Sequence, residues 1–315
     1  MDKALKVVVI CGGTSTEREI SLKSGSAVYN GLKEAGYSNV KLYDLNENNI
    51  GDILKMDIDI AYLALHGRGG EDGRIQSFLE LAGIPYTGPG VQASVLCMNK
   101  ILTKMVVKSS CIPTAKFIVI NKRELNHSEY VVEKVVSEIG IPAVVKAPSQ
   151  GSSIGVVIVK DKSEIMNALH EAAKYDDDLL VESFLDGTEV TLPIMGNDEL
   201  LVLPEIEITS EREFYDYKAK YTNGLYHHII PARISDEERE KVRDYGRKAY
   251  KALGCIGLSR IDFIIDKING PMVVEVNTIP GMTEMSLFPD AAKSIGIEFS
   301  ELVSRIVELG INTIR

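Results

Sequence analysis

The 315-residue sequence lacks the features that identify several large classes of protein. Its four cysteines form no C-x-x-C pair and its five histidines form no H-E-x-x-H spacing, so neither a disulfide framework nor a zinc site is expected. No stretch reaches the about 18 apolar residues of a membrane helix, and the N-terminal apolar run Val7–Cys11 is too short for a signal peptide. We therefore expect a cytoplasmic protein whose cysteines are small buried hydrophobic side chains.

Positive charge is also in deficit. Lys and Arg number 35 against 45 Asp and Glu, which gives a net charge of −10 and disfavours nucleic acid or an anionic membrane as a partner. A small phosphorylated ligand remains compatible with this balance, because a local cluster of lysines can outweigh the average. The length, with 45% hydrophobic and 25% charged residues, is typical of a globular chain of about two domains.

Strand and helix patterns alternate along the first third of the chain. The apolar run Lys6–Cys11 predicts a buried strand, and Glu19–Ala35 carries apolar residues at helical spacing. Val40–Tyr43 and Ile58–Leu65 predict further strands, and Ile75–Ala82 predicts a short helix. This alternation favours an α/β unit with a parallel sheet and helices on its faces.

The remaining two thirds predict mixed α and β structure. One helix is expected over about Ala93–Ser109, and a single strand over Leu200–Ile208. Further helices begin at Ser235 and near Phe299. We place domain boundaries near residues 95 and 185, which gives an N-terminal domain 1–95, a central lobe 96–185 and a C-terminal lobe 186–315.

A glycine- and serine-rich loop lies between two predicted strands, Pro142–Lys146 and Gly155–Lys160. It contains Gly-Ser-Ser-Ile-Gly at 151–155, which matches the G-x-S-x-G pattern of serine hydrolases. Because a nucleophile elbow joins a strand to a helix, and β-branched residues follow Gly155, we interpret the segment as a hairpin loop. Its backbone N–H groups can hold phosphate oxygens, with positive charge from Lys146, Lys100 and Lys220. Taken singly, each lysine is interpreted by default as a surface residue.

A second predicted hairpin carries two acidic residues. The Asn269-Gly270 turn joins a strand ending at Asp266 to one containing Glu275. If Asp266 pairs with Pro271, then Asp262 lies opposite Glu275, and Arg260 lies opposite Asn277 in the same way. Two facing carboxylates are destabilising unless a cation lies between them.

The predicted ligands Asp262, Glu275 and Asn277 offer only oxygen atoms, with no Cys or His, and such a set suits Mg²⁺. A solvated hairpin face is the alternative interpretation. Together with the Gly/Ser loop and the lysines, the hairpin predicts a site for a nucleoside triphosphate and its magnesium.

Several motifs, spread in order along nearly the whole chain, resemble one family. They are Gly12–Ser21; His66-Gly67 with Gly70–Gly73; Tyr86–Gly88; Asn99-Lys100; Gly151–Ser153; Phe214–Tyr221; Arg260–Asp262; and Glu275–Thr283 with Ser286-Leu287. The chain is identified by them as a member of the ATP-grasp superfamily, similar to the D-alanine–D-alanine ligase family. The resemblance implies a Rossmann-like N-terminal domain (pre-ATP-grasp), a central α+β ATP-binding lobe and a C-terminal α+β lobe. It further implies ligation of two D-alanines through a D-alanyl phosphate for peptidoglycan synthesis, and suggests a homodimer.

The resemblance also implies roles for individual residues, carried over by position. Glu17 would hold the ammonium group of the first D-alanine together with Ser152 and Tyr221, and His66 would line that pocket. Arg260 and the Gly281 N–H would stabilise the oxyanion, and Ser286 and Leu287 would receive the second D-alanine. The implied ATP contacts are Lys100, Lys146, Ser152, Ser153, Glu182, Leu185, Glu189 and Lys220, and two Mg²⁺ (or Mn²⁺ in their place) would bind to Asp262, Glu275 and Asn277.

The chain departs from the family pattern at two places. A glutamate usually precedes Gly-Ser-Ser, where this chain has Gln150, and a lysine usually follows the adenine-contacting glutamate, where it has Ser183. Three alternatives remain: a D-alanine–D-serine ligase, a D-lactate-using ligase, which Tyr221 disfavours, and a non-catalytic nucleotide-binding regulator. The last would be favoured by loss of Arg260, Asp262, Glu275 or Asn277, none of which is lost.

Overall fold

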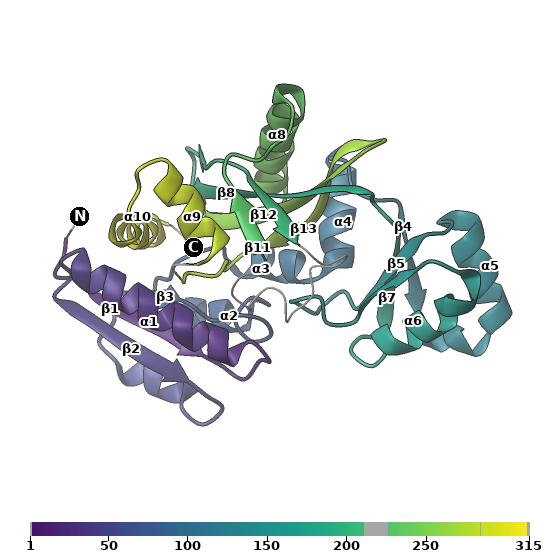
Figure 1. Cartoon of the computed structure of the whole chain (residues 1–315). Coiled ribbons are helices and arrows are strands. Elements are labelled where there is room, and N and C mark those ends of the chain that lie inside the picture. The colour runs from purple at the N-terminus through teal and green to yellow at the C-terminus, as the bar shows by residue number, and fades with distance from the viewer. Residues whose placement is uncertain (1, 211–225, 284, 314–315) are drawn as a thin grey trace.

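The computed structural model describes residues 2–210, 226–283 and 285–313. Three β-sheets follow one another along the chain, and Figure 1 shows the sheet of the C-terminal part lying between the other two. The predicted α/β class is confirmed, because one sheet is parallel with helices on both faces and two are antiparallel. The domain boundaries near residues 95 and 185 remain a prediction.

The first sheet is parallel. Its central strand β1 (Lys6–Gly12) pairs with β2 (Asn39–Leu45) and β3 (Ile60–Leu63). Alternate residues of β1 pack on opposite faces: Val7 and Val9 share a core with α1 (Arg18–Glu34) and α10 (Phe299–Ile311), and Val8 and Ile10 share one with α2 (Arg74–Leu81). The helix from the end of the chain thus completes the core of the first sheet.

The second sheet is antiparallel and has the strand order β4-β7-β5-β6. Val145 and Val181 belong to the core beneath α5 and α6, so their neighbours Lys146 and Glu182 face the opposite side of the sheet. The elements are β4 (Phe117–Asn121), α5 (Ser128–Glu138), β5 (Ala143–Lys146), β6 (Val156–Val159), α6 (Ile165–Ala172) and β7 (Asp178–Ser183), with short 3₁₀ turns at Lys122–Asn126 and Lys162–Glu164. A further 3₁₀ turn, Ile50–Lys55, connects β2 to β3 in the first sheet.

The third sheet has the order β11-β10-β8-β12-β13, with β9 paired to β8. Its apolar residues share a core with the long helix α8. The helix is amphipathic and begins with the predicted capping box, because Ser235 accepts from the Glu238 N–H while the Glu238 carboxylate accepts from the Ser235 N–H. The elements are β8 (Gly187–Gly196), β9 (Leu201–Val202), β10 (Ile206–Ser210), β11 (Tyr226–Ile229), α8 (Asp236–Ala252), β12 (Gly257–Asp266), β13 (Gly270–Asn277) and α9 (Leu287–Ser294).

Two predicted elements were wrong in detail. The single helix expected over Ala93–Ser109 is two helices, α3 (Val91–Met98) and α4 (Lys100–Ser109), because Asn99 is extended and its side chain caps α4 by accepting from two backbone N–H groups. The strand expected over Leu200–Ile208 is divided into β9 and β10. The short helix α9 was not predicted at all.

Cys11, Cys97 and Cys255 are buried as expected, whereas Cys111 is exposed, which corrects the expectation for that residue. Cys97 and Cys255 place their sulfur atoms 3.9 Å apart without a disulfide bond. Within the described residues, no helix combines the length and the apolar character needed to cross a membrane.

Candidate active site

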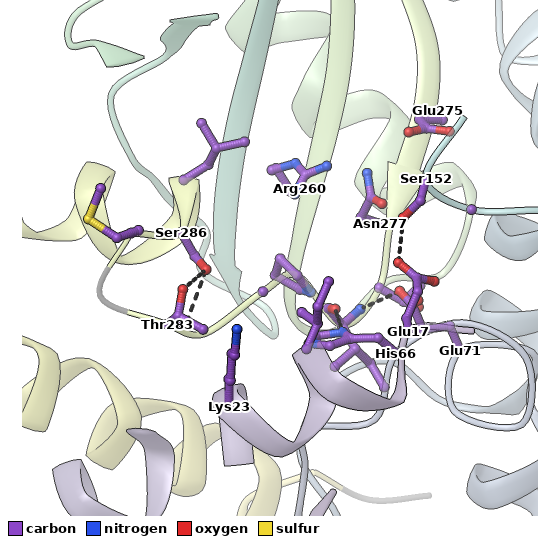
Figure 2. Close-up of a pocket in the computed structure, with 18 of the residues that line it drawn as sticks. Glu17, Lys23, His66, Glu71, Ser152, Arg260, Glu275, Asn277, Thr283 and Ser286 are labelled. Atoms are coloured by element: carbon purple, nitrogen blue, oxygen red, sulfur yellow. Dashed lines mark hydrogen bonds between the residues drawn. The ribbon is translucent and has the colours of Figure 1, made fainter. Parts of the chain in front are cut away.

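A cavity of about 890 Å³ lies where the three parts of the chain meet. Its walls come from α1, the loops after β3 and β5, the hairpin β12–β13 and the segment that leads into α9 (Figure 2). It gathers most of the residues that the motifs singled out. They are Glu17, His66, Lys100, Ser152, Arg260, Glu275, Asn277, Gly281, Ser286 and Leu287.

The acidic hairpin has the predicted register at its inner end. Asp262 pairs with Glu275, and Arg260 pairs with Asn277. The predicted pairing of Asp266 with Pro271 was wrong, because Asp266 pairs with Gly270 across a three-residue turn that Gly270 closes at a φ of +73°. A β-bulge between Asp262 and Phe263 absorbs this one-residue difference and restores the facing carboxylates.

Cationic side chains neutralise both carboxylates of the hairpin. Arg260 donates to Asp262 through Nε at 2.9 Å and Nη2 at 2.8 Å, and the Asn277 amide donates to the same carboxylate at 2.9 Å. Lys100 Nζ lies 2.9 Å from Glu275 Oε2 and donates to the Gln150 carbonyl. Burial alone would lower the pKa of Lys100, but the charge and hydrogen bond of Glu275, together with the charges of Glu182 and Glu71, raise that pKa above its usual value. Positive charge already occupies the place where the sequence predicts a divalent cation.

The donor set at this hairpin matches the chemistry of Mg²⁺. It consists of two carboxylates and one amide, and the described part of the chain contains no cluster of three His, Cys, Asp or Glu side chains that would suit a different metal. The residues therefore fit the predicted ion.

Glu17 and Ser152 join the first and second parts of the chain. Ser152 Oγ donates to Glu17 Oε1 at 2.6 Å, and Figure 2 shows the two side chains pointing toward each other. Ser152 and Ser153 have φ values of +52° and +60°, which are costly for residues with a Cβ and are found mostly at functional loops. The loop connects two antiparallel strands, so the hairpin interpretation of the G-x-S-x-G match is confirmed.

His66 and Glu71 lie beside Glu17 in the same wall (Figure 2). His66 Nδ1 faces the Ile279 carbonyl at 3.1 Å and its Nε2 faces Ser24 Oγ at 3.0 Å, while burial lowers the pKa of the ring. His66 is therefore neutral, with its proton on Nδ1. Burial raises the pKa of Glu71 to about 8, and the charge of Glu17 adds to this rise. The Glu71 carboxyl is therefore largely protonated at neutral pH.

The segment before α9 forms the opposite end of the cavity. Ser286 Oγ accepts from the Thr283 N–H at 3.0 Å and lies 2.9 Å from Thr283 Oγ1. A Cβ at Gly281 would come within 2.9 Å of Ser286 Oγ, so a side chain there would displace the serine. The backbone at Gly281 and the Ser286 hydroxyl are thus held close together.

A second cavity of about 430 Å³ lies between the central and C-terminal sheets. It is lined by Leu185 with Phe117, Ser183 and Met272, among others. Lys146 Nζ lies 2.5 Å from Glu182 Oε1, one residue before Ser183 in the chain. This second cavity, called the slot below, is lined by polar as well as apolar residues, and the Lys146–Glu182 pair comes from the strands β5 and β7 beside it.

Some predicted site residues are not brought into either cavity. Five of them line neither cavity: Lys146, Ser153, Glu182, Glu189 and Asp262. Lys146 and Glu182 pair with each other, and Asp262 pairs with Arg260 of the main cavity. Lys220 and Tyr221 lie outside the described residues.

Sequence reasoning missed several residues of the main cavity. Glu71 lies within the motif Gly70–Gly73, and Thr283 is the last residue of the motif Glu275–Thr283, but neither residue was assigned a role. Lys23 projects from α1 on the same side as Ile20 and Ala27. The helical spacing of these three residues was the available signal, but it cannot distinguish a cavity wall from solvent.

Comparisons with known proteins agree with this geometry. Residues 106–308 match the family profile described as "D-ala D-ala ligase C-terminus", and residues 45–89 match "D-ala D-ala ligase N-terminus". The D-alanine–D-alanine ligases of Carboxydothermus hydrogenoformans and Pelotomaculum thermopropionicum are 48% and 50% identical to this chain. The first comparison covers 98% of each chain, and the second covers 97% of this chain and 96% of the relative.

Solved structures are similar over the same length. The Bacillus anthracis D-alanine–D-alanine ligase, solved in complex with ATP, is 35% identical with a TM-score of 0.82, covering 98% of this chain and 97% of that one. The Enterococcus faecalis VanG D-Ala:D-Ser ligase is 30% identical with a TM-score of 0.83, covering 97% and 99%. Motifs, cavity and comparisons lead to one conclusion: the chain belongs to the D-alanine–D-alanine ligase family.

Proposed function

We propose that this protein joins two D-alanines to D-alanyl-D-alanine at the expense of ATP, for peptidoglycan precursor synthesis. ATP phosphorylates the carboxylate of the first D-alanine, and the amine of the second attacks the resulting D-alanyl phosphate and displaces phosphate. The observation that carries the proposal is one cavity that is lined by Glu17, by Arg260 and Glu275 of the hairpin, and by the segment from Gly281 to Ser286. Family membership supports the same activity.

The first D-alanine would bind at Glu17. The Glu17 carboxylate, ordered by Ser152, is a partner for an ammonium group, and neutral His66 and protonated Glu71 add no further charge at this end. Tyr221 would complete this set. Because His66 and Glu71 are uncharged, the substrate ammonium group would pair with Glu17 alone. The carboxylate of the same substrate would then point toward the hairpin.

ATP would lie between the two cavities, with adenine in the slot of Leu185 and Met272 beside Glu182, and Glu189 at the ribose. Lys100, Lys146 and Lys220, with the N–H groups of Ser152 and Ser153, would hold the phosphates. Two Mg²⁺ bound by Asp262, Glu275 and Asn277 would neutralise the phosphate charge in transfer. Lys100, whose Nζ lies 2.9 Å from Glu275 Oε2, would be one of the phosphate-binding cations.

The second step requires a positive group at the developing oxyanion. Arg260, at the inner end of the hairpin, and the Gly281 N–H would stabilise this charge. Ser286 and Leu287, at the start of α9, would receive the carboxylate of the second D-alanine.

The test is phosphate release with ATP and Mg²⁺ in the presence of D-Ala, D-Ser, D-lactate or L-Ala, with the products identified by mass spectrometry. D-Ala alone should give D-alanyl-D-alanine with one phosphate per dipeptide. ATP binding without any ligation would favour a nucleotide-binding regulator. Mixed D-Ala–D-Ser product would favour the second candidate, which the similarity to the D-Ala:D-Ser ligase supports. A single hydroxyl is a small difference for a pocket to reject.

The Ser152→Ala variant distinguishes ligation from serine hydrolysis. Ser152 positions Glu17 and is not a nucleophile in the proposed reaction, so we expect its loss to slow ATP-dependent ligation about tenfold without abolishing it. Steady-state phosphate release measures the effect. Labelling of Ser152 by a fluorophosphonate probe would contradict the ligase.

The Glu71→Gln variant tests the raised pKa of Glu71. Between about pH 5 and pH 8 the folded protein keeps a proton on Glu71 that the unfolded chain releases, so folding stability contributed by this carboxyl is lost as the pH rises. Glu71→Gln should remove this decline, which is on the order of 4 kcal/mol at about 1.36 kcal/mol per pH unit. Urea unfolding at pH 5.5 and pH 8.5 measures it. Parallel pH dependences in the variant and the wild type would contradict a raised pKa.

The proposed surroundings follow from the reaction. A cytoplasmic location would supply ATP and D-alanine, and the small-molecule substrates require no nucleic acid or membrane partner. The homodimer remains a prediction that light scattering would test.

A further inference from the structure

Two lysines share one buried carboxylate behind the nucleotide slot. Glu182 Oε1 lies 2.5 Å from Lys146 Nζ, and Glu182 Oε2 lies 2.6 Å from Lys104 Nζ. Glu182 is 4% exposed and Lys104 is 1% exposed. Burial alone would raise the pKa of Glu182, but the charges of Lys146 and Lys104 lower it to about 2. The carboxylate is therefore ionised at any physiological pH.

The arrangement follows from the register of the central sheet. Val144 pairs with Glu182 across β5 and β7, so Lys146, two residues further on, lies diagonally opposite on the same face. Phe117 pairs with Glu182 from the other side, and Lys104 Nζ lies 5.5 Å from the centre of the Phe117 ring. Lys104 comes from α4, a separate helix that packs against α3 and β13.

Lys104 also reaches the third sheet. Its Nζ donates to Thr114 Oγ1 at 2.7 Å, and Thr114 Oγ1 donates to the Val273 carbonyl of β13 at 2.7 Å. Thr114 lines the slot together with Met272 of β13 and Ser183 of β7. Lys104 therefore contacts Glu182 of β7 on one side of the slot, and it is linked to β13 on the other side through the hydroxyl group of Thr114.

Leaving a buried carboxylate without a partner carries a large free-energy cost, because its charge is then neither paired nor solvated. If Lys146 alone faced Glu182, turning its ammonium group toward a phosphate would incur this cost. With Lys104 on the other oxygen, Glu182 stays neutralised while Lys146 moves. Lys104, Lys146 and Glu182 together carry a net charge of about +1, close to where a polyphosphate would bind.

We propose that Lys104 is a positioning residue for the nucleotide: it holds the charge of Glu182 so that Lys146 is available to the ATP phosphates. This inference rests on the ATP site proposed above. Lys104 itself need not touch ATP, since it is held between Glu182 and Thr114. Its effect on nucleotide binding should therefore depend on Glu182.

A double-mutant cycle tests this dependence. We expect Lys104→Met to weaken Mg·ATP binding, measured by calorimetry, about tenfold or more, and to raise the KM for ATP while the KM for D-alanine stays within about threefold. In the E182Q background Lys146 no longer faces a negative charge, so it is available to ATP with or without Lys104. Adding Lys104→Met to this background should therefore change ATP affinity less than about threefold. The exposed Lys122, replaced by Met, is the matched control and should be without effect.

The outcomes separate this inference from the proposed function. Absence of ATP binding by the wild type would overturn the ATP site and the inference with it. Wild-type binding with an unaltered K104M variant would overturn the role of Lys104 alone. If K104M fails to fold, the comparison of E182Q with the double variant decides. An affinity loss of about tenfold or more between these two would show that Lys104 acts independently of Glu182 and would overturn the inference.

Discussion

Glu275→Gln is expected to reduce ligation by about a thousandfold or more while the fold survives. The substitution would keep the shape of the side chain but remove the charge that faces Asp262 and pairs with Lys100. A metal that stabilises charge in phosphoryl transfer contributes several kcal/mol, and each 1.36 kcal/mol is about tenfold in rate. Steady-state dipeptide formation at saturating ATP and Mg²⁺ measures the loss.

The matched control for this substitution is Glu240→Gln, which removes the same charge from the exposed surface of α8. It should behave as wild type. Thermal unfolding of both variants and Mn²⁺ titration in the presence of ADP give readouts independent of turnover, and only the Glu275 variant should lose metal affinity. Wild-type-like activity in Glu275→Gln would show that the facing carboxylates do not hold the catalytic metal.

Arg260→Lys is expected to lower dipeptide formation by about 10²–10³-fold. Lysine keeps the charge but cannot reproduce the two parallel hydrogen bonds to Asp262, which fix the guanidinium in the cavity. Loss of one oriented donor to an oxyanion typically has an effect of this size. The KM for ATP should change only a few-fold, because Arg260 is assigned to the second step.

Trapping the acyl phosphate separates the two steps. Hydroxylamine added with ATP and D-alanine should convert the intermediate to D-alanine hydroxamate in the Arg260→Lys variant nearly as fast as in the wild type, while dipeptide formation falls. An equal loss in both assays would mean that Arg260 acts through Asp262 in the phosphorylation step, and would overturn its assignment to the oxyanion.

Much of the fold could be predicted because the periodicity of apolar residues is local. The strand β1 lies where a continuous apolar run predicted it, and the helix α8 begins where the Ser235 capping box predicted it. The split between α3 and α4 escaped prediction because Asn99 can continue a helix or cap one, and the choice depends on Lys100 reaching Glu275. The helix α9 is short, and its apolar residues are held by the distant β1 and α10 core.

The site was predicted in part for a similar reason. The pairing of Asp262 with Glu275 was expected from a turn register that was wrong by one residue, and the unforeseen bulge between Asp262 and Phe263 cancels that difference. The contact between Glu17 and Ser152 spans 135 residues, and only the resemblance to a family suggested it.

The sequence by itself determined the α/β class, the acidic hairpin and the family, because each rests on local patterns or ordered motifs. The tertiary structure decided which charges neutralise one another. Lys100 with Glu275, and Lys104 and Lys146 with Glu182, come from separate helices and strands. No spacing along the chain encodes such pairs, since they form only when burial removes water and each carboxylate must find a cation.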